Sequence, residues 1–527
     1  MCGIFLFIGN KPIKRKKYLE KLFYKIKHRG PDESRIRYYN SNVMIGFHRL
    51  AIIDPTNSGM QPFEDERYVC LVNGEIYSYK KLIQEYSLQV KTHSDCEIVL
   101  PLFLKMKSIH SLCNNLDGEF AFIIYDTLEE KVYFGIDEIR ARPLFLSVDD
   151  EGIYLASEQK ATKGVVIPIP SGCCGTIDTG SFNIEHYYEY NVPICPSIEP
   201  HIILRQYLLE NVSNKLNPER EYGFLLSGGL DSSLICGIAA KMCAPTRIHT
   251  FTVGFDKNAS DVIAARKVAE NIDSIHTEFI FTYEDGIKML KSVIYANESW
   301  DQTTTRASIP MSLACKAIKK KHPEMAVIFS GELSDELLMG YLDWKSAPSL
   351  EEARNHLIKR VKDVTYFDGL RADRTVSSHG MELRLPFFSR KILDFVLSLE
   401  PSLLAPSHNN NIEKYLLRKA FDGLNYIPDE ILWRTKNAFS DATSIIGKTS
   451  WKEALKSHAE KEITNSRFNS RNLLYPDNTP QTKEDMLYRE IFEDFGYSSS
   501  CIPYKWSFAW NDGQTDSSAT ELKGFKE

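Results

Sequence analysis

A cysteine directly behind the initiator methionine is the first candidate for chemistry in this 527-residue sequence. Removal of Met1, the usual processing before a small residue, leaves Cys2 with a free α-amino group beside its own thiol. An α-amine titrates near pH ~8 and a thiol near ~8.5, so the neutral amine can accept the thiol proton. Cys2 is therefore a candidate N-terminal nucleophile, in which one residue supplies both nucleophile and base. The alternative interpretation is a chain that merely begins Met-Cys-Gly before an apolar strand at residues 4–8.

A glycine-rich segment near the middle of the chain is the second candidate. Its residues are Ser227-Gly228-Gly229-Leu230-Asp231-Ser232-Ser233, between an apolar run at 222–226 and a helix-forming run at 234–240. A strand, a glycine turn and a helix N-terminus in this order direct backbone N–H groups at a phosphate. The spacing is not Gly-x-x-x-x-Gly-Lys, which disfavours an ordinary P-loop kinase or GTPase. An aspartate inside a phosphate-binding loop repels the phosphate unless a divalent cation bridges them, so Asp231 is a candidate Mg²⁺ ligand.

The size and composition indicate a soluble enzyme of two or three domains. The formal net charge of −6 gives no general attraction for nucleic acid. Eleven cysteines without a Cys-x-x-Cys pair or Cys/His ligand spacing argue against structural zinc and a disulfide framework. No stretch approaches the ~20 apolar residues of a membrane span, and the short N-terminal apolar run lacks the basic region of a signal peptide. These features predict a cytoplasmic location, without a nucleic-acid or membrane partner.

The first part of the chain is rich in short β segments separated by turns that carry Gly, Asn, Asp and Pro. Only residues 17–26 and 97–106 have clear helical patterns. This part is expected to form stacked sheets with a few covering helices. The expected strands are 43–47, 68–72, 120–125, 131–135 and 152–156.

A proline-rich segment at 190–200 favours an extended linker. Beyond it, apolar strands at 222–226, 250–253 and 326–329 alternate with helical patterns such as 262–271, which predicts a parallel sheet wrapped by helices. The chain is then mostly helical to about residue 495. The predicted division is a first domain at 2–190, a linker at 191–204, a second domain at 205–510 and a polar tail at 511–527.

Over nearly its whole length the sequence resembles the glutamine-hydrolysing asparagine synthetases. The motifs in the first part are Met1-Cys2-Gly3-Ile4, His28-Arg29-Gly30-Pro31-Asp32, His48-Arg49-Leu50-Ala51-Ile52-Ile53-Asp54, Gln61-Pro62, Asn73-Gly74-Glu75-Ile76-Tyr77, Ser94-Asp95 and Leu116-Asp117-Gly118-Glu119-Phe120-Ala121-Phe122. Those in the second part are the glycine-rich segment, Asp301 with Thr303-Thr304 and Arg306-Ala307-Ser308, Ser330-Gly331-Glu332 with Ser334-Asp335-Glu336, His379-Gly380 with Glu382, Arg384 and Pro386-Phe387, and Lys436 before Phe439-Ser440-Asp441.

For the first domain the resemblance implies a class II glutaminase with the αββα sandwich of N-terminal nucleophile enzymes. Cys2 would attack the glutamine amide and form a thioester, with ammonia as the leaving group. Asn73 and the backbone of Gly74 would bind the oxyanion. Arg49 would bind the carboxylate of glutamine, and Asp95 and Glu75 its ammonium group. The implied glutamine-binding set is Arg49, Leu50, Ala51, Ile52, Ile53, Asn73, Gly74, Glu75 and Asp95.

For the second domain the resemblance implies a parallel-sheet α/β synthetase with a largely helical C-terminal part. Aspartate would attack the α-phosphorus of ATP to give β-aspartyl-AMP and pyrophosphate, and ammonia would then displace AMP. Glu332 would promote formation of the intermediate and accept a proton as ammonia attacks, while Asp231 and Asp335 would hold Mg²⁺. The implied ATP-binding residues are Leu226, Ser227, Gly228, Gly229, Asp231, Ser232, Val253, Ser330, Gly331 and Lys436. Asp301 and Arg306 are the candidates for the aspartate site.

The sequence departs from the family pattern at a few positions. Residues 139–141 replace a pair that usually includes glycine, Leu333 and Ala442 each replace a glycine, and Ser389 replaces an acidic residue. A residue with a Cβ reaches positive φ only at a cost, so Leu333 is the departure most relevant to Glu332. Two alternatives stay open: an ATP-dependent amide-forming enzyme with another carboxylate acceptor, such as one closing a β-lactam ring, and a pair of degraded domains kept for binding. The resemblance also makes a homodimer plausible.

Overall fold

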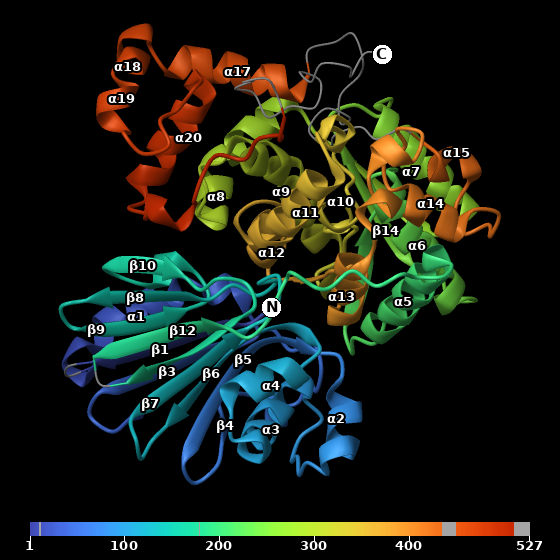
Figure 1. Ribbon diagram of the computed structural model, residues 1–527. Coiled ribbons are helices and arrows are strands. Elements are labelled where there is room, and N and C mark those ends of the chain that lie inside the picture. The colour runs from blue at the N-terminus through green and yellow to red at the C-terminus, as the bar shows by residue number, and fades with distance from the viewer. Residues whose placement is uncertain (10–11, 179, 435–449, 511–527) are drawn as a thin grey trace.

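The computed structural model describes residues 1–9, 12–178, 180–434 and 450–510, which form two halves joined by an extended segment (Figure 1). The first half contains two antiparallel six-stranded sheets, with the strand orders β10-β8-β9-β1-β3-β2 and β12-β11-β7-β6-β5-β4. Its strands are β1 (Gly3–Gly9), β2 (Glu33–Tyr39), β3 (Val43–Arg49), β4 (Phe63–Glu64), β5 (Tyr68–Ile76), β6 (Gly118–Asp126), β7 (Lys131–Ile136), β8 (Phe145–Asp149), β9 (Gly152–Ala156), β10 (Val165–Pro168), β11 (Cys173–Asp178) and β12 (Ser181–His186). Its α-helices are α1 (Lys16–Tyr24), α2 (Tyr79–Tyr86), α3 (Val99–Met106) and α4 (Ile109–Asn115).

Alternation along the strands explains how the two sheets stack, because successive side chains of a strand point to opposite faces. Ile4 and Leu6 of β1 belong to a buried cluster that also contains Leu71 of β5 and Ile123 of β6, so it lies between the sheets. The intervening Phe5 and Phe7 pack in a separate cluster with α1 on the outer face. On the other side, α3 and α4 contact β5, β7 and β11. The first half is therefore a helix–sheet–sheet–helix sandwich, as predicted.

The second half is built on one five-stranded parallel sheet with the order β15-β14-β13-β16-β17. Its strands are β13 (Glu221–Leu225), β14 (His249–Gly254), β15 (Ile275–Ile280), β16 (Met325–Phe329) and β17 (Glu382–Arg384). The helices around the sheet are α5 (Pro200–Lys215), α6 (Leu230–Cys243), α7 (Ser260–Asn271), α8 (Tyr283–Asn297), α9 (Gln302–Lys321), α10 (Ser334–Leu337), α11 (Leu350–Asp363), α12 (Asp368–Ser377), α13 (Arg390–Ser398), α14 (Tyr415–Phe421) and α15 (Asp429–Leu432).

The strand order changes direction beside β13. From β13 the chain proceeds outward through β14 and β15, and it then returns to place β16 and β17 on the opposite side of β13. The loops after the neighbouring strands β13 and β16 therefore lie side by side at the carboxyl edge of the sheet, and each continues to a different side of the molecule. Ligands of open parallel sheets bind at such a switch point.

The last described part of the chain is helical and packs on α8 and α9 (Figure 1). It comprises α17 (Trp451–Glu462), α18 (Asn465–Asn469), α19 (Arg471–Leu474) and α20 (Lys483–Asp494). Trp451 anchors it: this side chain is fully buried, and its ring stacks on Phe255 with the centroids 4.7 Å apart. This arrangement matches the predicted helical C-terminal part.

Buried ion pairs join the two halves. Arg29 lies 2.9 Å from Asp373 of α12, and Glu158 lies 2.7 Å from Arg374 of the same helix. Farther along the junction, Lys215 at the end of α5 lies 2.5 Å from Glu119 of β6. The first two pairs form a network, because Glu158 also lies 2.8 Å from Arg29 of its own half and Arg374 lies 3.2 Å from Glu298 of its own half. An isolated buried charge is costly, and the network spreads the counter-charges over both sides of the junction.

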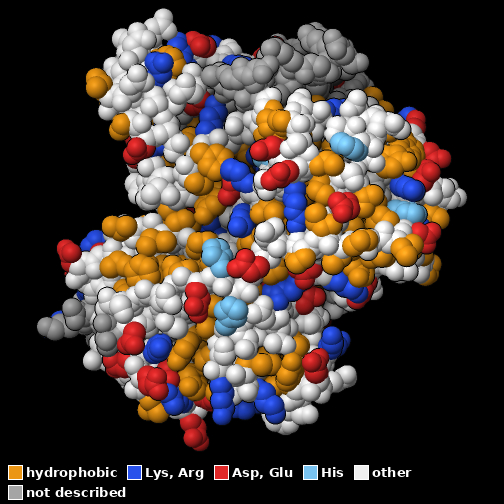
Figure 2. All heavy atoms as spheres, viewed as in Figure 1, with side chains coloured by type: hydrophobic (Ala, Val, Ile, Leu, Met, Phe, Trp, Pro, Cys, Tyr) orange, Lys and Arg blue, Asp and Glu red, His pale blue; other side chains and the backbone are white. Residues whose placement is uncertain are grey.

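The element boundaries differ from the sequence predictions in small and explicable ways. The helix predicted at 17–26 is α1, which ends at Tyr24, and the helix predicted at 97–106 is α3 preceded by a 3₁₀ turn at Asp95–Ile98. The segment predicted as a linker at 191–204 gives way to α5 at Pro200, because proline is well suited to the first turn of a helix. None of the helices in the described ranges is both long and apolar enough to cross a membrane. On the face in Figure 2, acidic and basic side chains are interspersed.

Candidate active sites

The first candidate site lies where β1 begins, at the junction of the halves, where Figure 1 also places the N-terminus. The thiol of Cys2 lies against the loop after β3: the backbone N–H of Leu50 donates to Sγ over 3.5 Å. The amine of Met1, the residue before Cys2, lies 3.8 Å from Oε2 of Glu382 in β17. Burial raises the pKa of the Cys2 thiol, and the positive charge of the Met1 amine opposes this shift. A strand of the second half thus supplies a carboxylate to the surroundings of the candidate nucleophile.

Among the residues predicted to bind glutamine, Leu50 contacts Cys2, and two others make unexpected contacts. Arg49 donates to the carbonyls of Asp54 and Thr56, and so holds the loop 50–56. Glu75 lies 3.0 Å from Arg384 of β17. Both side chains already have partners that a substrate must share or replace.

Hydrogen bonds from backbone N–H groups hold the loop 50–53 and Asp95. Asp32 accepts the N–H of Ala51 at 2.9 Å, and the carbonyl of Ile52 accepts the N–H of Glu219 at 3.2 Å. Asp95 accepts the N–H of Ile76 at 2.7 Å, and burial raises the pKa of this carboxyl to about 6.

Asn73 is a suitable oxyanion donor. It is fully buried in β5 next to Gly74, and neither atom of its side-chain amide has a hydrogen-bond partner within the described ranges. Buried polar groups are almost always paired, so an unpaired amide in this position needs an explanation. A carbonyl oxygen that becomes negative during a reaction would provide the missing partner.

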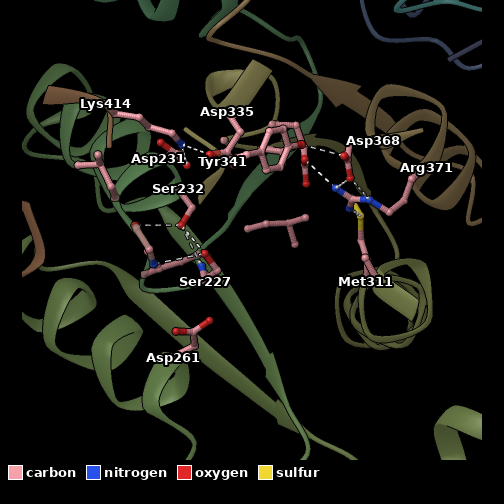
Figure 3. A pocket seen from close by; sticks show the side chains of 18 of the residues that line it. Ser227, Asp231, Ser232, Asp261, Met311, Asp335, Tyr341, Asp368, Arg371 and Lys414 are labelled. Carbon is pink, nitrogen blue, oxygen red and sulfur yellow. Dashed lines mark hydrogen bonds and ion pairs between the residues drawn. The ribbon is translucent and has the colours of Figure 1, made fainter. Parts of the chain in front are cut away.

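The second candidate site is a cavity at the switch point of the parallel sheet (Figure 3). The loop after β13 and the loop after β16 meet there so closely that a Cβ on Gly331 would lie 2.6 Å from the backbone nitrogen of Ser232. Gly228 makes the turn with φ +77° but does not line the cavity. The predicted residues that do line it are Leu226, Ser227, Gly229, Asp231, Ser232, Val253, Ser330, Gly331, Glu332 and Asp335.

The glycine-rich loop has the geometry of a phosphate-binding site. Helix α6 begins at Leu230, directly after the loop, so its unpaired N–H groups and positive dipole end face the cavity. Ser232 Oγ accepts the N–H of Ser227 at 3.1 Å and lies 2.9 Å from Ser227 Oγ. These contacts preorganise the loop, as the dashed lines in Figure 3 show.

The two predicted metal ligands converge on one cation that the sequence did not identify. Asp231 at the start of α6 and Asp335 in α10 each contact the ammonium of Lys414, with oxygen–Nζ distances of 2.5 Å and 2.7 Å. Both carboxylates are partly exposed to the cavity. The pair therefore fits a cation, although the described residues contain no group of three or more His, Cys, Asp or Glu arranged for a metal. Mg²⁺ suits such a pair because it usually takes one or two carboxylates and completes its shell with phosphates and water.

A network of charges occupies the opposite end of the cavity. Arg371 of α12 lies 2.7 Å from Glu332 and 2.9 Å from Asp368. Tyr341 donates to Asp368 at 3.0 Å and to Glu336 at 2.6 Å. Burial raises the pKa of Glu332, with Arg371 opposing, and burial raises the pKa of Glu336 to about 8. The sequence identified Glu332 but not the guanidinium, tyrosine and carboxylates around it.

The two residues predicted for the aspartate site do not line this cavity. Asp301 caps α9 by accepting the N–H of Thr304, and it also accepts the N–H of Trp506, both at 2.8 Å. Arg306 forms a buried ion pair with Glu484 of α20 at 2.6 Å. These side chains hold α9, whose Thr303 and Ala307 do line the cavity, so a role of Asp301 and Arg306 in ordering the aspartate site stays a prediction. Lys436 and Ala442 lie outside the described residues.

The other departures from the family pattern have structural explanations. Leu333 is buried at φ +76°, directly before α10. Arg140, at φ +54°, reaches across the junction to Oγ1 of Thr365 at 3.1 Å, and burial lowers its pKa to about 10. Ser389 caps α13 by accepting the N–H of Ile392 at 3.3 Å, a role that serine and an acidic residue fill equally well.

Comparison with known proteins links both sites to one family. A family model described as a glutamine amidotransferase domain matches residues 1–170, and one described as asparagine synthase matches residues 204–360 and 347–494. The asparagine synthetase (glutamine-hydrolyzing) of Gallus gallus is 38% identical over 566 residues, that of Bos taurus 37% over 570, and that of Homo sapiens 36% over 566. Each comparison covers 100% of this chain and 99% of the relative.

Among solved structures, the glutamine phosphoribosylpyrophosphate amidotransferase from B. subtilis, complexed with ADP and GMP, is 17% identical. The match covers 53% of this chain and 65% of that one, with a TM-score of 0.32, too low to compare the architectures in detail. The similarity to the three synthetases, in contrast, spans both halves and both candidate sites, and on this basis the chain belongs to the family of glutamine-hydrolysing asparagine synthetases.

Proposed function

We propose that this protein makes L-asparagine from L-aspartate, using ATP and ammonia released from L-glutamine, with L-glutamate, AMP and pyrophosphate as the other products. The cavity at the switch point carries the proposal, because the phosphate-binding loop, the carboxylate pair and Glu332 all line it. The family membership and the second site at Cys2 support the use of glutamine as the ammonia source.

In the first half, the thiolate of Cys2 attacks the amide carbon of glutamine. After removal of Met1, the thiol proton passes to the free α-amine of Cys2 and from there to the departing ammonia. A thioester remains, and water hydrolyses it to glutamate. Asn73, whose amide has no protein partner among the described residues, and the N–H of Gly74 donate to the oxyanion. Asp95 accepts the N–H of Ile76 and also contacts Cys96, and a carboxylate with about four lone-pair positions can still accept from the substrate ammonium.

In the second half, a side-chain carboxylate oxygen of aspartate attacks the α-phosphorus of ATP, and the bond to the β-phosphate breaks. Asp231 and Asp335 would hold Mg²⁺, which neutralises charge on the phosphates when bound. Ammonia then attacks the carbonyl carbon of β-aspartyl-AMP, the bond to AMP breaks, and Glu332 takes the released proton. Burial raises the pKa of Glu332, which makes its carboxylate a stronger base toward the attacking ammonia.

We propose that aspartate contacts the charge network next to Glu332, since Arg371 and Asp368 line the cavity and Asp301 and Arg306 do not. Aspartate carries an α-carboxylate and an ammonium, and it therefore needs a cation and an anion at the same end of the cavity. Arg371 can bind the carboxylate with its planar fork, and Asp368, which lies 2.9 Å from Arg371, can bind the ammonium. Both residues line the cavity together with Glu332, so the side-chain carboxylate of an aspartate bound there would point toward the phosphates.

The deciding experiment measures asparagine, AMP, pyrophosphate and glutamate from aspartate, MgATP and glutamine, with ammonium replacing glutamine in a parallel reaction. Near-equal amounts of all four are expected. Cys2→Ala is expected to stop glutamate formation and to leave ammonium-dependent synthesis, and Glu332→Ala to stop AMP and pyrophosphate formation. Glutamate without AMP or asparagine would contradict the proposal, and normal pyrophosphate formation by Glu332→Ala would contradict that assignment. A homodimer and a cytoplasmic location stay predictions.

A further inference from the structure

Lys414 is enclosed between the two carboxylates that are expected to hold the metal. Its Nζ lies 2.5 Å from Oδ2 of Asp231 and 2.7 Å from Oδ1 of Asp335, and only 3% of its side chain is exposed. The residue precedes α14 with φ +54°, and 183 residues separate it from Asp231. Figure 3 shows its stem entering the cavity from the side opposite Arg371.

The ammonium occupies the position between the carboxylates where a bridging cation would lie. A lysine ammonium is a compact point charge on a flexible stem, so it can neutralise both carboxylates and still be withdrawn. Its neighbour Glu413 does not compete for it, because Glu413 lies 2.9 Å from Lys345 and 3.8 Å from Arg418. Asp231 also accepts the hydroxyl of Ser334 at 2.7 Å, which fixes the carboxylate toward the cation.

Free Mg²⁺ is poorly suited to displace this ammonium. The ion gives up its water reluctantly and usually binds proteins through one or two carboxylates together with substrate phosphates. Without a nucleotide, entry of the ion would leave the buried ammonium without a counter-charge, which is costly. With MgATP, the phosphate oxygens can accept the ammonium at the moment when the metal takes the carboxylates.

We infer that Lys414 is a place-holding cation, which keeps Asp231 and Asp335 together when no nucleotide is bound and releases them to Mg²⁺ only when the metal arrives with the nucleotide. The inference rests on the proposed function in that it takes MgATP as the ligand. It goes further by predicting an order of binding: the protein excludes the free metal ion and accepts the metal–nucleotide complex.

The test uses MnCl₂ alone as the probe, on the full-length protein, with free Mn²⁺ followed by electron paramagnetic resonance. Wild-type protein is expected to bind Mn²⁺ at this site only after ATP is added. Lys414→Met keeps the apolar stem but removes the charge, and it is expected to bind Mn²⁺ without nucleotide at least about tenfold more tightly than wild type. Asp335→Asn in the Lys414→Met background should abolish this gain, which locates the bound ion.

Two further variants serve as controls. Lys345→Met removes a nearby lysine that contacts Glu413 and not the carboxylate pair, and it should leave Mn²⁺ binding unchanged. Lys414→Arg retains the charge and should still exclude free Mn²⁺. Tight binding of free Mn²⁺ to wild-type protein, lost in Asp335→Asn, would overturn the inference even if Lys414→Met does not fold.

Thermal unfolding with MgATP separates the two possible failures. If MgATP does not raise the melting temperature of the wild type, the proposed function fails. If MgATP stabilises the wild type but Lys414→Met gains no affinity for free Mn²⁺, the inference about Lys414 alone is wrong. Stabilisation by MgATP together with that gain supports both.

Discussion

Leu333 offers a direct test of how the loop beside Glu332 is held. The residue sits at φ +76° and ψ −15°, in the left-handed region, and its side chain is 2% exposed. The backbone conformation costs roughly 1–2 kcal/mol for an L-residue with a Cβ. Burial of a leucine in a core contributes more than this, since truncation to alanine costs about 3–5 kcal/mol. Packing of the side chain therefore stabilises a conformation that the backbone alone disfavours.

Substitutions at this position separate packing from strain. Leu333→Ala loses the packing and keeps the strained backbone, so a destabilisation of about 3–5 kcal/mol is expected. Leu333→Gly loses the same packing but relieves the strain, and it should be more stable than Leu333→Ala by about 1 kcal/mol. This order reverses the one found in ordinary helix or strand positions, where glycine is less stable than alanine.

Denaturant unfolding of the two variants and the wild type provides the comparison, with MgATP-dependent pyrophosphate formation measured in parallel. A looser loop should lower kcat more than it raises the KM for ATP, because Glu332 acts in the chemical step. Equal or greater stability of Leu333→Ala relative to Leu333→Gly would refute the argument, since it would mean that residue 333 does not adopt positive φ.

Three other predictions concern a histidine, a glycine and an arginine. Burial lowers the pKa of His48 to about 4, so between pH 6.5 and 4 the unfolded chain binds more protons than the folded protein. The free energy of unfolding of the wild type should therefore fall by up to about 3 kcal/mol as the pH is lowered from 6.5 to 4. Unfolding of His48→Gln at pH 4–7 should show a shallower loss. A Cβ on Gly340 would lie 2.1 Å from Cε of Lys414, so Gly340→Ala should abolish stabilisation by MgATP while glutaminase activity, the internal control, persists. Arg384→Met leaves Glu75 buried without its guanidinium, and should cost roughly 3–5 kcal/mol and raise the KM for glutamine. An unchanged KM would exclude a role for this pair in the glutamine site.

The sequence predicted elements best where one pattern dominates. The alternation in residues 3–9 places Ile4 and Leu6 on one face and Phe5 on the other, and both faces are covered, which is the arrangement of the sandwich. The glycine-rich loop was equally clear, because a strand, a tight turn and a helix N-terminus can be recognised locally. In both cases the information lies within a few consecutive residues.

Contacts that depend on distant chain segments were beyond the sequence. Lys414 has no motif that links it to Asp231, and only the folded structure brings the two together. Asp301 and Arg306 belong to a clear motif, but a residue that caps a helix and one that contacts a ligand look the same in sequence, so the cap and the ion pair with Glu484 became visible only in the structure. The network around Arg371 was missed for the same reason, since α12 reaches the cavity only through the tertiary fold.

The buried ion pairs at the junction limit how this protein can be divided or recombined. Asp373 of the second half is buried and lies 2.9 Å from Arg29 and 3.8 Å from Arg142, both in the first half. The second half produced alone would therefore leave this carboxylate without these two counter-charges. A chimaera that joins one half of this chain to the opposite half of a relative would also leave buried charges without partners. This is avoided only if the charged residues on both sides of the junction are exchanged together. The two halves therefore have distinct folds but cannot be exchanged independently of each other. The two partners of each ion pair across the junction must be exchanged together.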